Sequence, residues 1–140
     1  MKARAVEGLD PAAPLRTNAV RIVGTRLAEL RALAAPALRP EASQAQHDLR
    51  IAAKRLRYVL ELAEPCFGPE AADARRFAKR LQTVLGDLHD CDAMLPSAAD
   101  VASLQTLLRT RRELLFKEFT ELWSGQAEAT WLALERALAI

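Results

Sequence analysis

The sequence predicts an all-α protein, built as an antiparallel bundle of four long helices. Three observations point to that fold class. About half of the 140 residues are hydrophobic, and most of these are alanine and leucine, which favour helices. Valine and isoleucine, which favour strands, are scarce, and only five glycines are present. Prolines and glycines divide the chain at wide intervals, which leaves long helix-compatible blocks joined by short loops.

The chain is most simply one domain over residues 1–140, in which residues 1–14 form a leader turn. The expected helices cover residues 15–38, 43–64, 69–95 and 97–123, and the last is expected to kink or break near Gly125 before it continues to Leu138. Pro36 and Pro40 are expected to close the first helix, and Pro65 with the Phe67-Gly68-Pro69 turn the second, because proline has no backbone N–H to donate. Ser43 is the expected N-cap of the second helix.

The second expected helix contains a basic stretch at residues 47–58, HDLRIAAKRLRY. On a helix that turns by about 100° per residue, Leu49, Leu56 and Leu60 face the core. Four basic residues form a separate stripe beside that face, at spacings of three, four and three: His47, Arg50, Lys54 and Arg57. Like charges at these spacings repel one another. Either acidic residues of a neighbouring helix or an external anion must therefore offset them.

The third expected helix carries a matching pattern. Its expected core residues are Phe77, Leu81, Val84, Leu85 and Leu88. A second basic stripe consists of Arg76, Lys79 and Arg80, and it continues to Asp87 and Asp90. If the two helices are antiparallel neighbours, both stripes line one groove, where arginine and lysine donors suit phosphate oxygens. The pattern alone leaves a second interpretation open, in which the stripes are solvated faces balanced by nearby acids.

The segments HDLRIAAKRLRYVLEL and FAKRLQTVLGDLHDCDAML resemble the CHAD domain, the conserved histidine α-helical domain. The pattern has a histidine followed by Arg-Ile, a basic pair before Leu-Arg, and a later Leu-Gly and Asp-x-Asp signature. These elements fall on His47, Arg50-Ile51, Lys54-Arg55-Leu56-Arg57, Leu85-Gly86 and Asp90-x-Asp92.

The resemblance implies a helical fold whose basic surface binds inorganic polyphosphate, or another phosphate-rich polyanion, without catalysis and without a cofactor. The matching residues are His47, Arg50, Lys54 and Arg57 on one wall and Arg76, Lys79 and Arg80 on the other. Binding is expected to weaken as salt rises. It is expected to strengthen when His47 is protonated below its reference pKa of about 6.5.

Members of this family usually carry two copies of the unit in one chain, and this chain has one. Either the chain works as a single bundle, or two chains pair about a two-fold axis. The homodimer is the favoured interpretation.

Two other functions stay open. The dipeptides His47-Asp48 and His89-Asp90 are compatible with a metal-dependent phosphohydrolase, in which histidine and aspartate bind a metal that activates water. The cations around His47 oppose a divalent metal, which disfavours this interpretation. The remaining alternative is a helical interaction module whose basic stripes meet acidic partner helices.

Charged and aromatic residues of the last block have expected places in the fold. Asp92 and Arg111 both fall on apolar arcs, and an unpaired buried charge is costly, so the two are expected to pair. Four aromatic residues are expected in the core or on a dimer surface: Phe116, Phe119, Trp123 and Trp131. Because no aromatic residues interleave the basic stripes, sequence-specific binding of nucleic acid is not expected.

The composition also bounds the location of the protein. Cys66 and Cys91 lack metal-ligand spacing and are expected to be reduced thiols. No segment approaches the roughly 20 apolar residues of a membrane span. The sequence therefore predicts a soluble cytoplasmic protein that does not bind membranes.

Overall fold

The computed structural model describes residues 2–139, and that range consists of helices, the connections between them and an N-terminal segment. The α-helices are α1 (Leu15–Ala37), α2 (Ser43–Phe67), α3 (Pro69–Met94), α4 (Ala102–Leu122) and α5 (Glu128–Leu138). A 3₁₀ turn, η1 (Leu95–Ala98), lies between α3 and α4, and a π-helical turn, η2 (Trp123–Ala127), lies between α4 and α5. The all-α prediction is confirmed. No helix in residues 2–139 is long and apolar enough to cross a membrane.

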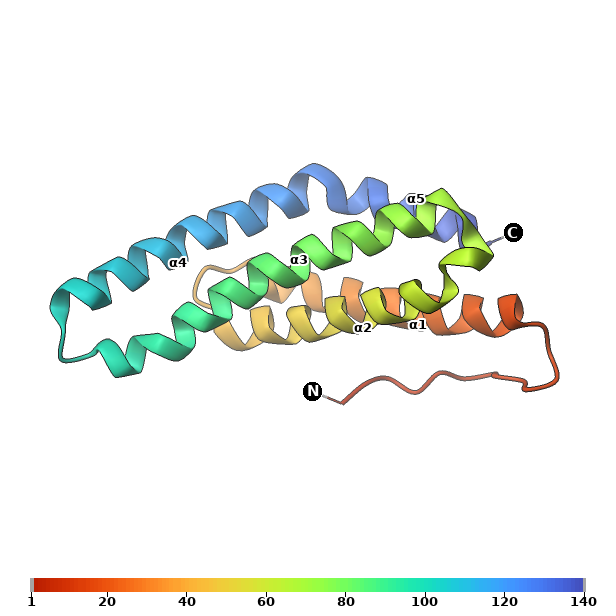
Figure 1. The fold of residues 1–140 in the computed structure, drawn as a ribbon, viewed down its shortest axis with the longest axis horizontal. Helices are drawn as coiled ribbons and strands as arrows, with labels where there is room; N and C mark the ends of the chain where they lie inside the picture. The colour runs from red at the N-terminus through yellow and green to blue at the C-terminus, as the bar shows by residue number, and fades with distance from the viewer. Residues whose placement is uncertain (1, 140) are drawn as a thin grey trace.

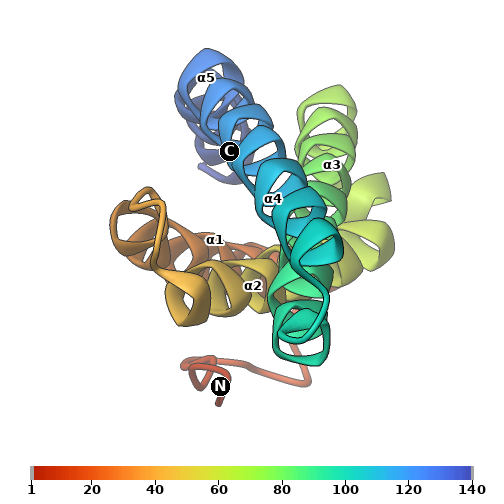
Figure 2. The same cartoon turned by 90° about the vertical axis from the view of Figure 1, so that its left-hand side faces the viewer.

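α1 to α4 reverse direction at each loop, and each of these helices contacts the next, whereas α5 runs on from α4 through η2 and contacts α3 (Figure 1). α1 and α2 lie side by side in one part of the molecule, and α3, α4 and α5 lie in the other (Figure 2). The contact between α2 and α3 is the most extensive between any two helices. The hairpin of α3 and α4 projects beyond the loop that joins α1 to α2 (Figure 1).

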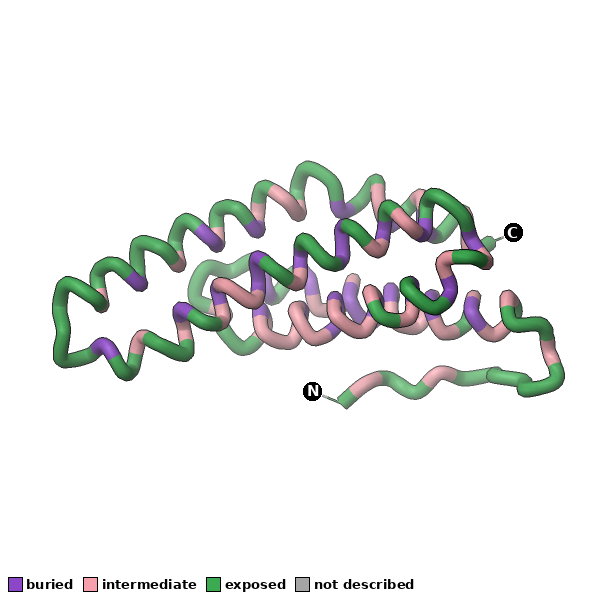
Figure 3. Tube along the Cα trace, viewed as in Figure 1, coloured by how far each residue is buried: buried purple, intermediate pink, exposed green. Residues whose placement is uncertain are grey.

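The core follows the predicted apolar pattern closely on α3. Every expected core residue of that helix is buried: Phe77, Leu81, Val84, Leu85 and Leu88. Phe119 and Trp131 are buried, and Phe116 and Trp123 pack against the core, so the four aromatic residues belong to the core. Most of α4, by contrast, lies at the surface (Figure 3).

Several helix ends differ from the predictions. Pro36 lies inside α1, and Pro65 lies inside α2, which continues to Phe67. Because Phe67 is buried, its packing keeps the last turn of α2 helical although Pro65 donates no hydrogen bond. Ser43 is the first residue of α2, not its N-cap, and its side chain makes no capping hydrogen bond. α4 begins later than predicted because the 3₁₀ turn η1 precedes it.

One buried carboxylate ties the N-terminal segment to α1 and α2. The backbone N–H of Arg4 donates to Glu29 Oε2 at 2.7 Å, and Glu29 is only 3% exposed. Arg26 and Arg55 approach the same carboxylate at 3.7 and 3.6 Å. The segment consequently runs alongside α1 and α2 (Figures 1 and 2). Arg55, the basic residue outside the predicted stripe, therefore has a structural role.

The predicted pair between Asp92 and Arg111 is wrong by one residue. Arg111 is exposed, whereas Arg112 Nε donates to Asp92 Oδ1 at 2.5 Å and Arg112 Nη2 donates to Asp92 Oδ2 at 3.2 Å. Arg112 Nη2 also donates to Gln46 Oε1 at 2.8 Å. Arg112 Nη1 donates to the carbonyl oxygen of Pro40 at 2.6 Å. One guanidinium group thus joins α4 to α3, to α2 and to the loop before α2.

We expect Arg112→Leu to lower the free energy of unfolding by about 3 kcal/mol, because it leaves the charge of Asp92 and the amide of Gln46 without their partner. Urea denaturation followed by circular dichroism measures the change. Arg109→Leu is the matched control, since Arg109 is exposed on the same helix, and its effect should stay within about 0.5 kcal/mol. Equal losses in the two variants would contradict the anchoring role of Arg112.

Candidate functional site: a basic groove between α2 and α3

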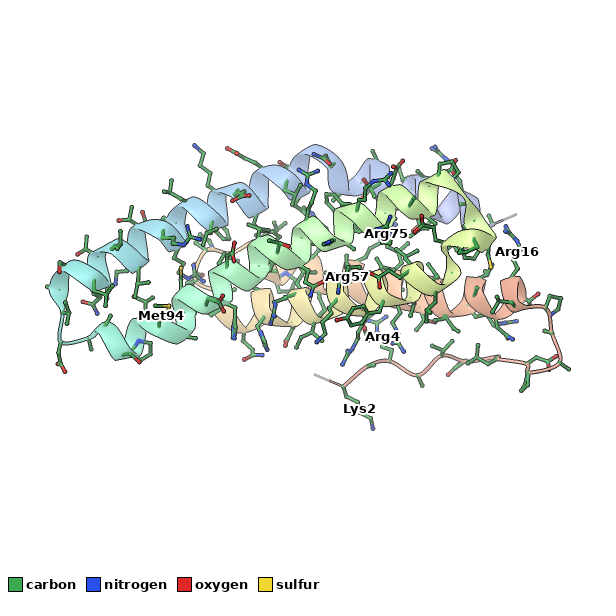
Figure 4. All side chains as sticks on the ribbon, viewed as in Figure 1. Lys2, Arg4, Arg16, Arg57, Arg75 and Met94 are labelled. Atoms are coloured by element: carbon green, nitrogen blue, oxygen red, sulfur yellow. The ribbon has the colours of Figure 1, made fainter. Side chains whose placement is uncertain are left out.

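A groove of about 250 Å³ follows the seam between α2 and α3, and we call it the basic groove. Its lining residues are Arg50 and Arg57 from α2 and Lys79, Gln82, Thr83, Gly86, Asp87 and Asp90 from α3. Arg57 lies where the two helices run side by side (Figure 4). The structure therefore brings two cations of the first predicted stripe together with one cation of the second.

One antiparallel register relates α2 to α3. The rings of His47 and His89 stack, with 4.3 Å between their centroids. Three residues further along α2 and three residues back along α3, the side chain of Arg50 lies against Gly86. A Cβ atom at Gly86 would stand 3.3 Å from Arg50 Nε, which is closer than ordinary van der Waals contact. The absence of a side chain at Gly86 is therefore what lets the Arg50 side chain cross the surface of α3.

The same register accounts for the rest of the groove. Arg57 is seven residues beyond Arg50, and Lys79 is seven residues before Gly86, so the two cations stand at the same level and line the groove together. Lys54 falls level with Gln82 in this register. Lys54 is half-buried and does not line the groove, although it belongs to the same stripe.

Three polar atoms around the groove are buried and have no hydrogen-bond partner in the described part of the chain: Arg50 Nε, Arg57 Nε and Gln82 Oε1. The guanidinium group of Arg57 lies over the ring of Tyr58, 4.6 Å from its centroid, and Nε is 3.8 Å from a carboxylate oxygen of Glu61. Arginine and lysine donors gathered in one groove suit a ligand rich in acceptor oxygens.

Two acidic residues reduce the positive charge at one end of the groove. Asp87 and Asp90 line it near the histidine pair, but no ion pair within residues 2–139 joins either carboxylate to Arg50, Arg57 or Lys79. The cations of the groove are thus not paired with its own acids. The end at Arg57 and Lys79 is the more positive of the two.

Arg76 and Arg80, the other members of the second predicted stripe, lie on the opposite side of the α3 ridge. They line a larger groove of about 670 Å³ between α3 and α4, whose other wall contains Glu118 and Glu121. We call this the α3–α4 groove. Lys79 lines both grooves, so it stands on the ridge between them. The two predicted stripes consequently meet only in part.

The surroundings of His47 disfavour its protonated form. Burial lowers the pKa of His47 most, and the proximity of His89 and of Arg50 lowers that pKa further, against a smaller opposing effect of Asp48. Nδ1 of His47 is buried and has no hydrogen-bond partner in the described residues. Sequence reasoning missed the contact between the rings, because it depends on the register between two helices.

The histidine pair does not have the geometry of a metal site. The ring planes are stacked at 23° to each other. The lone pair of an imidazole nitrogen lies in the plane of its ring, so two stacked rings do not direct their nitrogens at one ion. Across residues 2–139, no group of three or more histidine, cysteine, aspartate or glutamate side chains is arranged to hold a metal.

Gln82 and Gly86 line the groove but were not predicted from the sequence as site residues, whereas Thr83 lies on the second predicted stripe and His89 was considered only as a metal ligand. Of these, Gly86 had a signal in the sequence. It is the glycine of the Leu-Gly motif, and a glycine inside a long helix destabilises the helix unless a close approach requires it.

The chain was compared with known proteins in three ways. The family model described as the CHAD domain matches residues 1–98. That range contains α1, α2, α3 and both walls of the basic groove, whereas α4 and α5 lie outside it. Comparison with curated proteins and with solved structures finds no match. Because the matched residues are well over half of the chain, this protein belongs to the CHAD domain family.

Proposed function

We propose that the protein binds inorganic polyphosphate, or a similar chain of phosphates, in the basic groove. The observation that carries the proposal is the convergence of Arg50, Arg57 and Lys79 on two packed helices, with no ion pair in the described residues to the acids that line the same groove. Membership in the CHAD domain family supports the same ligand class. Phosphate oxygens are strong acceptors for the charged donors of arginine and lysine.

The proposed mechanism is multivalent neutralisation of charge. Arginine offers a planar fork of donors, while lysine acts as a point charge, and both are held on rigid helices. A phosphate chain enters at the positive end beside Arg57 and Lys79, with Lys54 on the adjacent face of α2. Arg76 and Arg80 lie beyond the α3 ridge, on which Lys79 stands, in a groove whose other wall is acidic, so we expect them to contribute less to binding than Arg50, Arg57 and Lys79.

His47 is the weakest member of the predicted site. Its pKa is lowered, so it carries little positive charge near neutral pH, and it lies at the end of the groove where Asp87 and Asp90 repel phosphate. The strengthening of binding that the sequence predicts on protonation of His47 is therefore expected at a lower pH than the reference value of 6.5.

The proposal is one of binding without turnover. The groove offers donors and positive charge, and the function needs no cofactor. The homodimer and the cytoplasmic location that the sequence predicts remain separate predictions, since one copy of the chain already contains both walls of the basic groove.

We expect Arg50→Ala/Lys54→Ala/Arg57→Ala to weaken binding of long-chain polyphosphate by about 100-fold, since each lost contact is worth roughly 1 kcal/mol. Isothermal titration calorimetry at two salt concentrations measures the dissociation constants. Binding by the wild type should weaken as the salt concentration rises, because the attraction is electrostatic.

The matched control removes three positive charges from other surfaces, with Arg39→Ala/Arg109→Ala/Lys117→Ala. All three control residues are exposed and none lines the basic groove. If the control variant loses as much affinity as the groove variant, net charge explains the binding and the groove is not the site. Absence of binding by the folded wild type at low salt rejects the proposed function.

We expect Gly86→Ala to have opposite effects on stability and on binding. Alanine favours a helix over glycine by about 1 kcal/mol, so the helix gains intrinsic stability. The new Cβ atom would stand 3.3 Å from Arg50 Nε, so the Arg50 side chain must shift by a few tenths of an ångström, and polyphosphate should bind more weakly. Thermal denaturation and calorimetry measure the two effects.

Gly24→Ala is the control for that substitution. Gly24 also lies inside a helix, α1, and a Cβ atom there would meet nothing within 4 Å. It should raise stability and leave polyphosphate binding unchanged. Unchanged binding in Gly86→Ala as well would show that the position of Arg50 over α3 does not matter for the ligand.

We expect the protein to lose stability as the pH falls below 6.5. The pKa of His47 is lower in the folded chain than the reference 6.5, so the unfolded chain binds more protons between those two values, and protonation favours unfolding there. Urea denaturation across this range should show a smaller loss for His47→Gln than for the wild type. An NMR titration of the His47 ring with a pKa at or above 6.5 would contradict the expectation.

A further inference from the structure

α4 carries a stripe of exposed apolar residues that the basic groove does not explain. Leu104, Leu107 and Leu114 are 39%, 64% and 64% exposed. Together with the exposed residues Arg111 and Glu118, they recur at spacings of three and four, so they share one face of the helix. We call these five residues the α4 stripe. Single exposed leucines are ordinary, but three on one face of one helix, beside a cation and an acid, have the composition of an interaction surface.

The stripe runs into the α3–α4 groove. Val84 and Leu122 contribute apolar surface to that groove, while its two walls carry opposite charges. Glu118 belongs both to the stripe and to the acidic wall, which makes the apolar row and the groove one continuous surface. The first half of α4 lies on the hairpin that projects from the rest of the molecule, where a second molecule has access (Figures 1 and 3).

We propose that a second copy of this chain docks on the α4 stripe, with the two α4 helices packed antiparallel about a two-fold axis near Leu114. This inference goes beyond the proposed function and does not depend on polyphosphate. A two-fold interface requires a surface that complements itself. The order of residues along α4 satisfies that requirement.

The charges on the stripe are self-complementary. Arg111 precedes Leu114 by three residues and Glu118 follows it by four, about 4.5 and 6 Å along the helix axis. In the antiparallel pair, Arg111 of each copy therefore lies opposite Glu118 of the other, and the two Leu114 side chains meet at the axis. Antiparallel packing also opposes the two helix dipoles favourably.

The apolar residues are self-complementary as well. Leu107 precedes Leu114 by seven residues, and Leu122 follows it by eight. Leu107 of one copy therefore reaches the apolar surface that Leu122 and Val84 of the other copy contribute to the α3–α4 groove. The protruding Leu107 and the α3–α4 groove that it would enter belong to the same chain, which favours a second copy over an unrelated helix as the occupant.

A polyanion is a poor occupant of this surface, because Glu118 and Glu121 face Arg76 and Arg80 across the α3–α4 groove. Docking of a second copy covers this groove and leaves Arg50 and Arg57 open on the other side of the α3 ridge. Dimer formation and polyphosphate binding are thus separable by experiment.

The first test is the mass of the protein in solution, measured by size-exclusion chromatography with light scattering over a dilution series. The wild type should have twice the mass of one chain, and Leu107→Glu/Leu114→Glu should have the mass of one chain with an unchanged circular dichroism spectrum. Leu62→Glu is the matched control, since Leu62 is 81% exposed on α2, away from the stripe, and this variant should remain a dimer.

The second test uses reversed charges. Arg111→Glu and Glu118→Arg should each raise the dissociation constant of the dimer by about 10-fold or more, and the double variant should restore it, because both ion pairs re-form in reverse. Analytical ultracentrifugation measures these constants. A wild type that is monomeric throughout, a dimer that survives Leu107→Glu/Leu114→Glu, or a double variant without rescue overturns the proposal.

Polyphosphate titration of the Leu107→Glu/Leu114→Glu variant separates the two proposals. Retained binding by the monomeric variant supports docking on α4 as an event distinct from ligand binding. If the dimer responds to the substitutions as expected but the wild type does not bind polyphosphate, the proposed function is rejected and the docking of a second copy on α4 is still supported.

Discussion

The close antiparallel contact between α2 and α3 is the constraint on which the rest of the structure depends. The contact between these two helices is the most extensive between any two helices of the described residues, and alanines are buried on both of them, among them Ala52 and Ala53 on α2 and Ala74 and Ala78 on α3. A long side chain on one helix lies across the other, as Arg50 does at Gly86. The positions of the groove cations follow from this single register, and so does the stacking of the two histidines.

The cations of the chain fall into two groups according to how their charge is balanced. Arg55 and Arg112 meet the carboxylates of Glu29 and Asp92, which are largely buried, and these pairs hold segments of the fold together. Among the described residues, the cations of the basic groove have no buried carboxylate as partner: Arg57 Nε lies 3.8 Å from the exposed Glu61, and Asp87 and Asp90 line the groove without an ion pair to its cations. The net charge of +2 is small, so a polyanion is attracted by this local segregation of charge and not by the molecule as a whole.

Helical periodicity was sufficient to predict the all-α fold and the buried face of α3, because a regular apolar repeat reports burial directly. It failed on α4, where Arg111 was placed in the core instead of Arg112. The buried residues of α4 are Leu108, Leu115 and Phe119, and around the helix their face lies nearer to Arg112 than to Arg111, whereas Leu104, beside Arg111, is exposed. Contacts between helices, such as His47 on His89, depend on register and depth of packing, which no single helix encodes.

The error on α4 has a physical consequence of its own. If all the apolar residues of a helix were buried in the core, its remaining faces would expose only polar residues. α4 instead buries Leu108 and Leu115 and still exposes Leu107 and Leu114 beside them, so its apolar surface is wider than the core can cover. The excess lies next to the α3–α4 groove, whose opposed charges disfavour a polyanion, whereas the basic groove on the other side of α3 favours one. The ridge of α3 thus separates a surface suited to a protein helix from a surface suited to phosphate.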